Sequence, residues 1–322
     1  MTTPRERTRL HGHEAAWQQF ISVMRSGRLH HAWLLTGVEG IGKTTMAFMM
    51  ARALLNAQDH DSPVGRRITA GTHADLLVVG RGVDEKTRRP RREIVGDDVR
   101  PIGAFLRRTA AEGGWRVVIV DGAEYMNRTA ANAILKILEE PPTGAILILT
   151  CAAPGRLLPT IRSRCRTLDL APLSPREVRA VLMDIVADGY GAEDIDNVIA
   201  LAHGSAGRAL SLLQKDATKL SALVEQVMRG AARGTEAYRI AGSILESENG
   251  FSVFFDLLCD AISTGTRELL GAPSHEGQPR DTRPERMAGA WQDLVRLRAE
   301  TENFNLDKQQ ALLSALARVN AI

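Results

Sequence analysis

A glycine-rich segment at residues 37–44 has the composition of a phosphate-binding loop. It matches the pattern G-x-x-x-x-G-K-[ST] at every position. Glycines let backbone N–H groups close around phosphate oxygens, and the Lys43 ammonium is expected to reach the β- and γ-phosphates of a nucleotide. The Thr44 hydroxyl is expected to bind the Mg²⁺ that accompanies those phosphates. The residues that we assign to nucleotide binding here are Gly37, Gly40, Gly42, Lys43, Thr44 and Thr45.

The segments on either side of this loop have the patterns that a phosphate-binding loop requires. Residues 32–36 form a short apolar run that is typical of a buried strand. Residues 45–55 are largely apolar and contain neither Gly nor Pro, which favours a helix. The amino end of that helix adds partial positive charge beside the phosphates. The alternative is a chance glycine turn, which the agreement between motif and context disfavours.

An acidic residue, Asp121, follows the run Arg-Val-Val-Ile-Val at residues 116–120. An unbroken run of β-branched residues is typical of a central strand in a parallel sheet. In a P-loop fold, an acid at the end of such a strand holds Mg²⁺, usually through water. The alternative is that Asp121 only caps the next turn. The intact phosphate loop favours the metal-binding role.

The composition of the 322-residue chain is that of an ordinary globular protein, with 44% hydrophobic and 25% charged residues. Its length predicts about two or three domains. A net charge of +3 is too small to indicate nucleic-acid binding by itself. Residues 1–9 lack an apolar core, and no apolar run is long enough to span a bilayer, so we expect a cytoplasmic protein. The cysteines, which are widely spaced and expected to be reduced thiols, are Cys151, Cys165 and Cys259.

Strand and helix patterns alternate in the first half of the chain. This alternation predicts an α/β domain with a parallel sheet in a three-layer core. Residues 56–71 are polar and are predicted to form a loop, and Asn127 is a suitable N-cap for a helix. The expected strands are 32–36, 75–79, 116–121 and 145–150, with a short strand at Ile94, and the expected helices are 10–26, 45–55, 98–111 and 127–140.

Helical patterns alone fill the chain after residue 172, where we expect no strand. Ser174 followed by Pro175 is typical of a helix start. Residues 271–283 are rich in Gly, Pro and charge and are predicted to form a loop between two helices. The clearest helices expected in this half are 221–228, 237–245, 251–270 and 284–301.

Basic side chains crowd together in residues 81–92. A solvated loop is favoured there over a DNA contact, because charge runs usually form solvated surface. Its role and any direct contact with DNA are left open. The basic residues of this segment are Arg81, Lys86, Arg88, Arg89, Arg91 and Arg92.

Three further motifs carry a family resemblance. Residues 29–32 read Leu-His-His-Ala, residues 132–142 read Asn-Ala-Ile-Leu-Lys-Ile-Leu-Glu-Glu-Pro-Pro, and residues 159–165 end in Ser-Arg-Cys. Together with the phosphate loop, they resemble the AAA+ clamp-loader ATPases of bacterial DNA polymerase III. The run at 132–142 followed by Ser-Arg-Cys is highly specific to that family. The resemblance covers nearly the whole chain and is weakest between residues 215 and 300.

Two motifs nearer the C-terminus are most similar to the delta prime branch of this family. Residues 204–210 resemble its lid motif, and residues 305–309 resemble its C-terminal end. The resemblance implies an AAA+ core at residues 1–172, a small helical lid at 173–215 and an all-helical collar at 216–322, which joins five subunits in a ring. It also implies ATP and Mg²⁺ as ligands. The implied partners are gamma/tau-type and delta-type loader subunits, the sliding clamp and primed DNA.

The resemblance assigns roles to two further residues. Arg164 matches an arginine finger, supplied in trans to the ATP of a neighbouring subunit, where it stabilises charge on the transferred phosphoryl group. Thr150 matches the first sensor position. We expect the Arg164 motif to lie beyond the final core strand, on the opposite side from the phosphate loop. The alternative for Arg164 is a surface salt bridge.

The chain departs from the hydrolysing members of the family at two positions. Gly122 stands where they carry the Glu that activates the attacking water, and Glu124 is expected to point elsewhere. Gly207 stands where their lid carries an Arg. Arg208 follows it, but one residue along a helix is a turn of about 100°, so its side chain is expected to miss the phosphate. Many relatives also carry a four-cysteine zinc module, whereas residues 56–80 contain no cysteine, so we predict no zinc.

These features favour a delta prime-like clamp-loader subunit that acts in DNA replication. As a stator it would hold the geometry of the ring, bind ATP, hydrolyse it weakly or not at all, and donate Arg164. One alternative is an ATP-hydrolysing motor subunit of the gamma/tau type, which the intact Lys43 and Thr44 favour. Another is a structural adaptor with a relic phosphate loop. A branch-migration helicase is less favoured, because it would need a C-terminal winged helix with strands.

Overall fold

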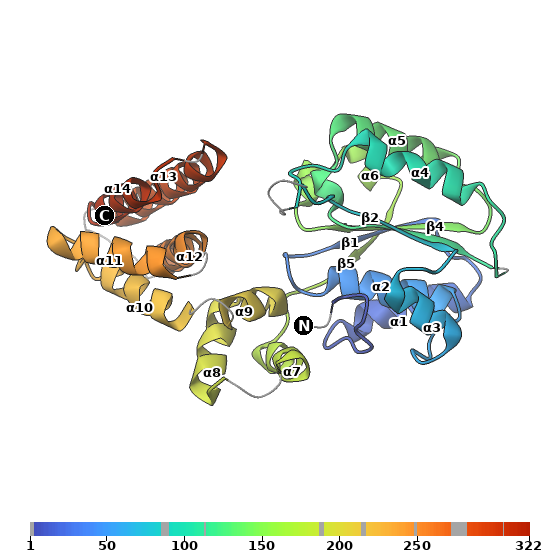
Figure 1. Cartoon of the computed structure of the whole chain (residues 1–322), viewed down its shortest axis with the longest axis horizontal. Helices are drawn as coiled ribbons and strands as arrows, with labels where there is room; N and C mark the ends of the chain where they lie inside the picture. The colour runs from blue at the N-terminus through green and yellow to red at the C-terminus, as the bar shows by residue number, and fades with distance from the viewer. Residues whose placement is uncertain are drawn as a thin grey trace. The chain divides into compact units, whose positions relative to one another are not determined.

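The computed structural model divides the chain into two compact units (Figure 1). Unit 1 comprises Met1–Gly189 and His203–Arg208, and unit 2 comprises Tyr190–Ala202 and Ala209–Ile322. The predicted domain boundaries at residues 172 and 215 stay a prediction. The residues that the structure describes are 3–84, 90–112, 114–186, 190–213, 217–247, 250–271, 282–304 and 306–322.

A sheet of five parallel strands forms the centre of unit 1, in the order β2-β3-β4-β1-β5. The carboxyl ends of all five strands therefore lie along one edge. The inner strands β1, β3 and β4 are buried at every residue, as expected where helices cover both faces. The strands are β1 (Ala32–Thr36), β2 (Leu76–Val79), β3 (Arg116–Val120), β4 (Ala145–Cys151) and β5 (Arg166–Asp169).

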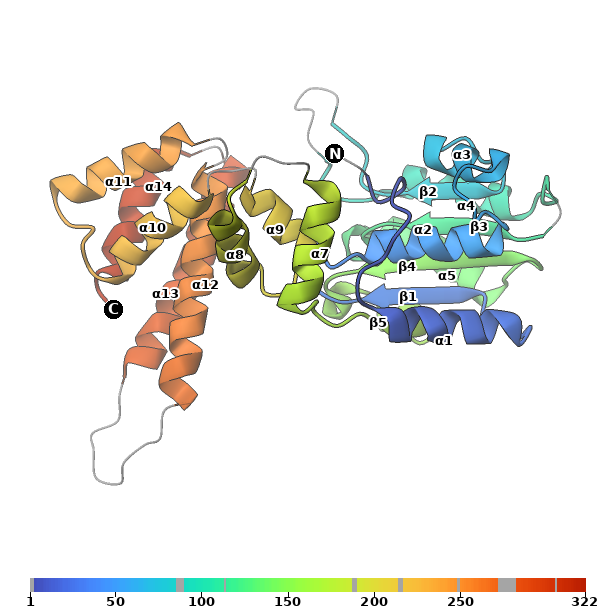
Figure 2. The ribbon, with the colours of Figure 1, turned by 90° about the horizontal axis from the view of Figure 1, so that it is seen from below.

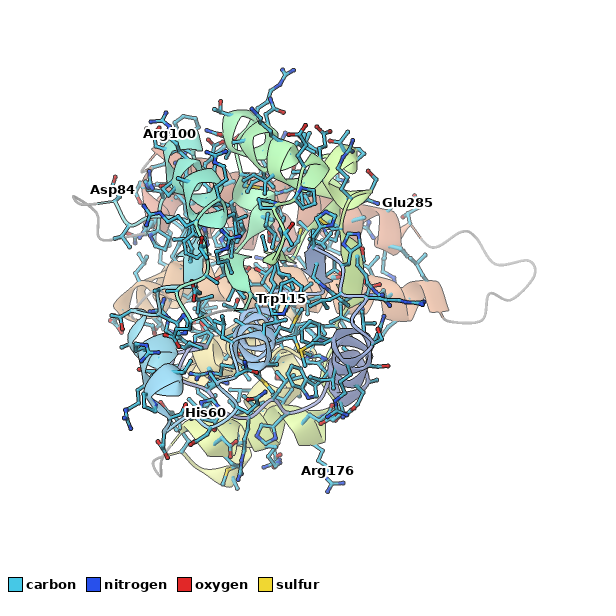
Figure 3. The ribbon with its side chains drawn as sticks, turned by 90° about the vertical axis from the view of Figure 1, so that its right-hand side faces the viewer. His60, Asp84, Arg100, Trp115, Arg176 and Glu285 are labelled. Carbon is cyan, nitrogen blue, oxygen red and sulfur yellow. The ribbon has the colours of Figure 1, made fainter. Side chains whose placement is uncertain are left out.

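Helices cover both faces of this sheet and give unit 1 the predicted three layers (Figure 1). Figure 3 shows the layers from one end, with Arg100 and His60 labelled on opposite sides of the sheet and Trp115, next to β3, between them. Each face has its own core, with Phe20 and Met46 buried in one and Ile134 in the other. The helices are α1 (Glu14–Arg25), α2 (Lys43–Leu54) and α3 (Pro63–Ala70) on one face, and α4 (Gly96–Leu106), α5 (Arg128–Glu139) and α6 (Pro159–Arg162) on the other.

Two predicted helices have different ends in the structure. The helix predicted at residues 10–26 begins only at α1, because Gly12 and His13 have φ angles of 71° and 64°, which a right-handed helix does not contain. The helix predicted at residues 98–111 ends five residues early, at the end of α4. The Asp75 carboxylate accepts two backbone N–H groups beyond that point, at 2.9 and 3.1 Å, and these bonds stabilise a separate turn.

The loop predicted at residues 56–71 was wrong, because it contains α3. Ser62 caps this helix by accepting the N–H of Gly65 at 3.0 Å, and Pro63 occupies the first helical position. Gly71 ends the helix with a φ of 73°. The sequence therefore contains both a helix-start signal and a helix-stop signal. The polar composition of the segment nevertheless favoured the prediction of a loop.

The fifth strand, β5, was not predicted. Its sequence, Arg-Thr-Leu-Asp, contains one fully buried side chain, Leu168, and so lacks the apolar run that marks the inner strands. Pairing with β1 makes it an edge strand. The short strand expected at Ile94 is only an isolated bridge to Met126.

Every element that the structure describes after β5 is a helix, as predicted. Helix α7 (Pro175–Ile185) belongs to unit 1, and Ser174 caps it as expected. In unit 2, α12 and α13 pack side by side as a long pair (Figure 2). None of the described helices has the combined length and apolar character needed to cross a membrane. The remaining helices are α8 (Ala192–Leu201), α9 (Ala206–Leu213), α10 (Ala217–Met228), α11 (Thr235–Glu246), α12 (Gly250–Gly271), α13 (Arg283–Phe304) and α14 (Lys308–Val319).

Candidate nucleotide-binding site

The phosphate loop connects β1 to α2 and encloses the side chain of Lys43. Gly42, directly before α2, has a φ of 110°, a conformation that glycine adopts without strain. The Lys43 ammonium donates to the carbonyl oxygens of Gly37 and Val38 at 2.9 and 2.8 Å. Lys43 is only 8% exposed. The loop therefore wraps around a buried cation.

The charge of Lys43 is not matched by a direct ion pair. Burial lowers the pKa of Lys43, and the more distant carboxylates of Glu124 and Glu39 oppose that effect. Among the described residues, no carboxylate lies within salt-bridge distance of its ammonium. A buried cation without a paired anion is a favourable place for an anionic ligand such as a phosphate group.

Asp121 accepts hydrogen bonds from two hydroxyl groups at the carboxyl edge of the sheet. Thr44 Oγ1 and Thr150 Oγ1 each donate to Asp121 Oδ1 at 2.7 Å. Thr150 is 1% exposed, and its hydroxyl also accepts the N–H of Gly122 at 2.9 Å. The parallel strands explain why these side chains lie close together. Strand β4 lies between β3 and β1, Thr150 is the penultimate residue of β4, and Asp121 directly follows β3. The phosphate loop that follows β1 brings Thr44, in the first turn of α2, to the same edge. The structure thus brings together three residues that the sequence selected separately.

The residues at this edge fit a nucleotide phosphate chain with Mg²⁺. Thr44 offers a hydroxyl oxygen and Asp121 a carboxylate, which are oxygen ligands of the kind that Mg²⁺ prefers, with phosphate oxygens and water completing its shell. Lys43 and the amino end of α2 offer positive charge to the phosphates. Thr45, in the first turn of α2, is buried. Nowhere in the described chain do three His, Cys, Asp or Glu side chains converge on a protein-only metal site.

Gly122 and Glu124 lie next to this cluster in an arrangement that differs from an Asp-Glu pair. Gly122 has a φ of 79° and directly precedes the short 3₁₀ helix η1 (Ala123–Tyr125). A Cβ atom on Gly122 would lie 2.7 Å from the ring of Tyr125. Glu124 Oε1 accepts the N–H of Ala152, in the loop after β4, at 2.8 Å. Glu124, the next carboxylate after Asp121 in the sequence, is therefore hydrogen-bonded to the backbone of another loop.

Ser205 and the first turn of α9 are hydrogen-bonded directly to the phosphate loop. The Gly207 N–H donates to the carbonyl of Gly40 at 2.8 Å, and the Ser205 hydroxyl donates to the carbonyl of Glu39 at 2.7 Å. A Cβ atom on Gly207 would lie 2.8 Å from the Cα atom of Gly40. Gly207 therefore supports a close backbone approach that a side chain would prevent. The backbone N–H of Arg208 donates to Ser205 Oγ at 3.1 Å.

Arg164 lies at the other end of the sheet. It follows α6 and precedes the first residue of β5 by two positions, whereas the phosphate loop follows the last residue of the parallel neighbour β1. The length of β5 alone, roughly 13 Å at 3.3 Å per residue, separates these two ends. The Arg164 side chain is 36% exposed and pairs with Glu139 at 2.9 Å. The surface salt bridge that the sequence left open as an alternative is thus present.

The basic segment at residues 81–92 is described only in part. Lys86, Arg88 and Arg89 lie outside the described residues. Arg91 pairs with Asp98 at 2.5 Å, so it is not a free cation. The Arg81 guanidinium lies 3.8 Å from the ring centre of Tyr125 in η1, a contact that the sequence did not predict.

The cysteines are free thiols, as predicted. Burial is the main cause that raises the pKa of Cys151 to about 11 and that of Cys165 to about 12. Both are therefore protonated at neutral pH, and neither has the lowered pKa of a reactive thiol. Cys165, the last residue of the Ser-Arg-Cys motif, packs against the core on the α5 side of the sheet.

A parallel sheet with a phosphate loop after one strand and an acidic residue after another defines a P-loop protein with an AAA+ type core. The family model described as DNA polymerase III, delta subunit, matches residues 12–174. The chain is 34% identical to the delta prime subunit of Pseudomonas aeruginosa over 254 residues, which are 76% of this chain and 74% of that protein. The chain belongs to the family of DNA polymerase III delta subunits.

Other relatives include both delta prime and tau subunits. The delta prime subunit of Escherichia coli is 34% identical over 62% of this chain and 59% of its own length. The tau subunit of the same organism is 27% identical over 81% of this chain and 42% of its own length. The higher identity is therefore to the delta prime proteins.

Proposed function

We propose that this chain is the delta prime-type subunit of a DNA polymerase III clamp loader, which loads the sliding clamp onto primed DNA during replication. The similarity to delta prime subunits and the motif at residues 204–210 support this assignment. In the proposed complex its partners are gamma/tau-type and delta-type subunits in a ring of five. The proposed location is the cytoplasm.

Within that complex the chain binds ATP with Mg²⁺ and hydrolyses it poorly. The observation that carries this proposal is a complete phosphate-binding cluster beside an incomplete catalytic one. Thr44, Asp121 and Thr150 are joined by direct hydrogen bonds, and Lys43 is held by the carbonyl oxygens of the phosphate loop. The position after Asp121 is Gly122, so no carboxylate side chain is attached where one would activate water.

The chain also supplies Arg164 to the ATP of a neighbouring subunit. Its position at the amino end of the sheet, away from the phosphate loop, supports an action in trans. A guanidinium is always charged and can bond two phosphate oxygens at once. Arginine fingers of this kind are worth about a thousandfold or more at the site they face.

Residues 216–322 carry the assembly function in this proposal. Helices α10 to α14 bury apolar side chains among themselves and leave others exposed, such as Tyr238 at 60% and Trp291 at 41%. A chain that ends at Lys215 should fail to join the ring in sedimentation while keeping its nucleotide affinity. Normal assembly of the shortened chain would move the assembly function elsewhere.

Equilibrium ATP binding and steady-state hydrolysis test the central part of the proposal. The purified chain should bind Mg²⁺–ATP, and Lys43→Ala should weaken binding by about tenfold to a hundredfold, because a charge-assisted contact is lost. Hydrolysis by the chain alone should stay far below the ordinary enzyme range. A turnover on the order of 1 s⁻¹ or more would favour a gamma/tau-like motor subunit instead. Absence of ATP binding would favour an adaptor with a relic loop.

A further inference from the structure

The guanidinium of Arg164 is held from two directions in the isolated chain. Its Nη1 donates to the carbonyl of Thr160, on α6, at 3.0 Å. Its Nη2 lies 2.9 Å from Oε1 of Glu139, the last residue of α5. Two separate helices therefore fix the plane of the guanidinium, although more than a third of the side chain is exposed.

These two contacts leave most of the donors of Arg164 available. A guanidinium has five N–H groups in a rigid plane, and the contacts with Thr160 and Glu139 use one N–H each. The remaining N–H groups can still bond a phosphate group in the same plane. The ion pair with Glu139 is thus compatible with phosphate binding and does not have to break for it.

The carboxyl end of α5, which carries Glu139, is held in place by His31. The His31 Nε2–H donates to the carbonyl of Leu138 at 3.1 Å, and the ring of His31 stacks on that of His30 with their centres 4.4 Å apart. The exposed carbonyl groups at a helix carboxyl end favour a nearby cation. Glu139 and the carboxyl end of α5 therefore place negative charge beside Arg164, and His31 fixes the position of that helix end.

We propose that Glu139 is a positioning residue for Arg164, which orients the guanidinium before a neighbouring subunit brings its ATP. This inference deepens the proposed function and rests on the action of Arg164 in trans. A finger that is already oriented loses less conformational entropy when it meets the γ-phosphate. Glu139 does not touch the ATP; it acts through Arg164 alone.

A mutant cycle in the reconstituted loader tests this role. The variants are Glu139→Ala, Arg164→Ala and the double variant, with Glu140→Ala as the matched control. Glu140 is the adjacent residue, is also exposed and makes no ion pair with any residue that the structure describes. The readouts are the pre-steady-state ATPase rate of the loader, its apparent KM for ATP, and assembly of the ring.

Glu139→Ala should lower the rate at the one site that Arg164 faces by about two- to fivefold, the range for loss of an exposed ion pair. Assembly should be normal, and the effect should fall on the rate more than on KM. Glu139→Ala should add nothing to Arg164→Ala, because its effect passes through the same guanidinium. Glu140→Ala should match the unmutated loader.

Two results would overturn the positioning role by itself. One is an unchanged rate in Glu139→Ala beside a clear loss in Arg164→Ala. The other is an additive loss in the double variant, which would mean that Glu139 acts by another route. No loss in Arg164→Ala would overturn the trans role, and the positioning role with it, so the two failures are distinguishable.

Discussion

The two ends of the parallel sheet in unit 1 are built in different ways. At the carboxyl end, Asp121, Thr44 and Thr150 form a partly buried cluster that is joined by hydrogen bonds within the chain. At the amino end, Arg164 is 36% exposed and is held by a surface ion pair and one backbone carbonyl. Buried polar groups that are fully bonded specify one geometry, whereas an exposed cation leaves donors for another molecule.

The cluster at the carboxyl end is therefore complete within this chain, whereas Arg164 at the amino end has donors left for a partner subunit. Changes at the carboxyl end should alter nucleotide binding and stability of the isolated chain. Changes at Arg164 should leave both nearly unchanged and appear only in the assembled loader.

Asp121→Ala should have the largest effect on the isolated chain. It removes the acceptor of Thr44 and Thr150 and the carboxylate proposed to hold Mg²⁺. We expect Mg²⁺-dependent ATP affinity to fall by about tenfold to a hundredfold, and the free energy of unfolding to fall by about 1–3 kcal/mol, since the Thr150 hydroxyl is left buried. Isothermal titration with and without Mg²⁺ and urea unfolding measure the two quantities.

The matched control is Asp97→Ala, on the first turn of α4. Its side chain is 77% exposed, and among the described residues it pairs with Arg100 alone, on the same helix. Such a pair contributes little to stability, so the variant should stay within about 0.5 kcal/mol of the unmutated chain. Equal ATP affinity in the Asp121→Ala and Asp97→Ala variants would remove Asp121 from the nucleotide site.

Gly207→Ala should destabilise unit 1 by about 1–3 kcal/mol. The new Cβ atom would meet the Cα and carbonyl oxygen of Gly40 at 2.8 and 3.2 Å, and backbone atoms cannot rotate aside. Gly155→Ala is the control, because no heavy atom lies within 4 Å of its Cβ position. Urea unfolding compares the two. A Gly207→Ala variant as stable as the unmutated chain would show that this contact with the phosphate loop is not tight.

We expect the free energy of unfolding to depend on pH through His73, which precedes β2 at the amino end of the sheet. Its side chain is 1% exposed, and its Nδ1 accepts the N–H of Asp75 at 3.1 Å. Burial lowers the pKa of His73, against the opposing charges of Glu112 and Asp75. The folded chain therefore binds fewer protons than the unfolded chain just below the ordinary pKa of about 6.5, and the free energy of unfolding should fall as the pH drops through that region.

His73→Asn should reduce that pH dependence, because the amide oxygen can replace the Nδ1 acceptor and does not titrate in this range. Urea unfolding at several values from roughly pH 5 to 8 measures the slope for both chains. Identical slopes would mean that His73 titrates alike in the folded and unfolded chains.

Arg164→Ala should have the smallest effect on the isolated chain. The exposed ion pair with Glu139 contributes at most about 1 kcal/mol to the free energy of unfolding. The ATP affinity of the chain itself should not change, because β5 lies between Arg164 and the carboxyl edge. Titration calorimetry on the variant checks this. A marked loss of ATP affinity would place Arg164 near the chain's own nucleotide and erase the contrast between the two ends.

The parts predicted well from sequence are those with a local signal. The phosphate loop has a fixed spacing, and β3 is an apolar run that is followed by Asp121, so both could be located without a structure. The parallel sheet then implies that Asp121 and Thr44 meet at its carboxyl edge. Strand β5 was missed because an edge strand with one buried residue has no such signal.

Contacts between distant segments could not be predicted. Nothing local in the sequence indicates that Gly207 touches Gly40, or that Glu139 pairs with Arg164. The sequence identified Gly207 only as a departure from an arginine, and the structure gives it a positive role in a close backbone contact. The pairing of Glu139 with Arg164 depends on the packing of α5 against α6, which only the fold supplies.

The trans role of Arg164 is tested most directly by the ATPase of the reconstituted loader with Arg164→Ala or with Arg162→Ala. Arg162 lies two residues earlier and makes no ion pair among the described residues. Arg164→Ala should disable the one site that Arg164 faces, by about a thousandfold or more, so that total hydrolysis falls in part and clamp loading falls further. Arg162→Ala should be milder. Equal hydrolysis and loading in the Arg164→Ala and unmutated loaders would contradict the account and leave Arg164 as a surface salt-bridge residue.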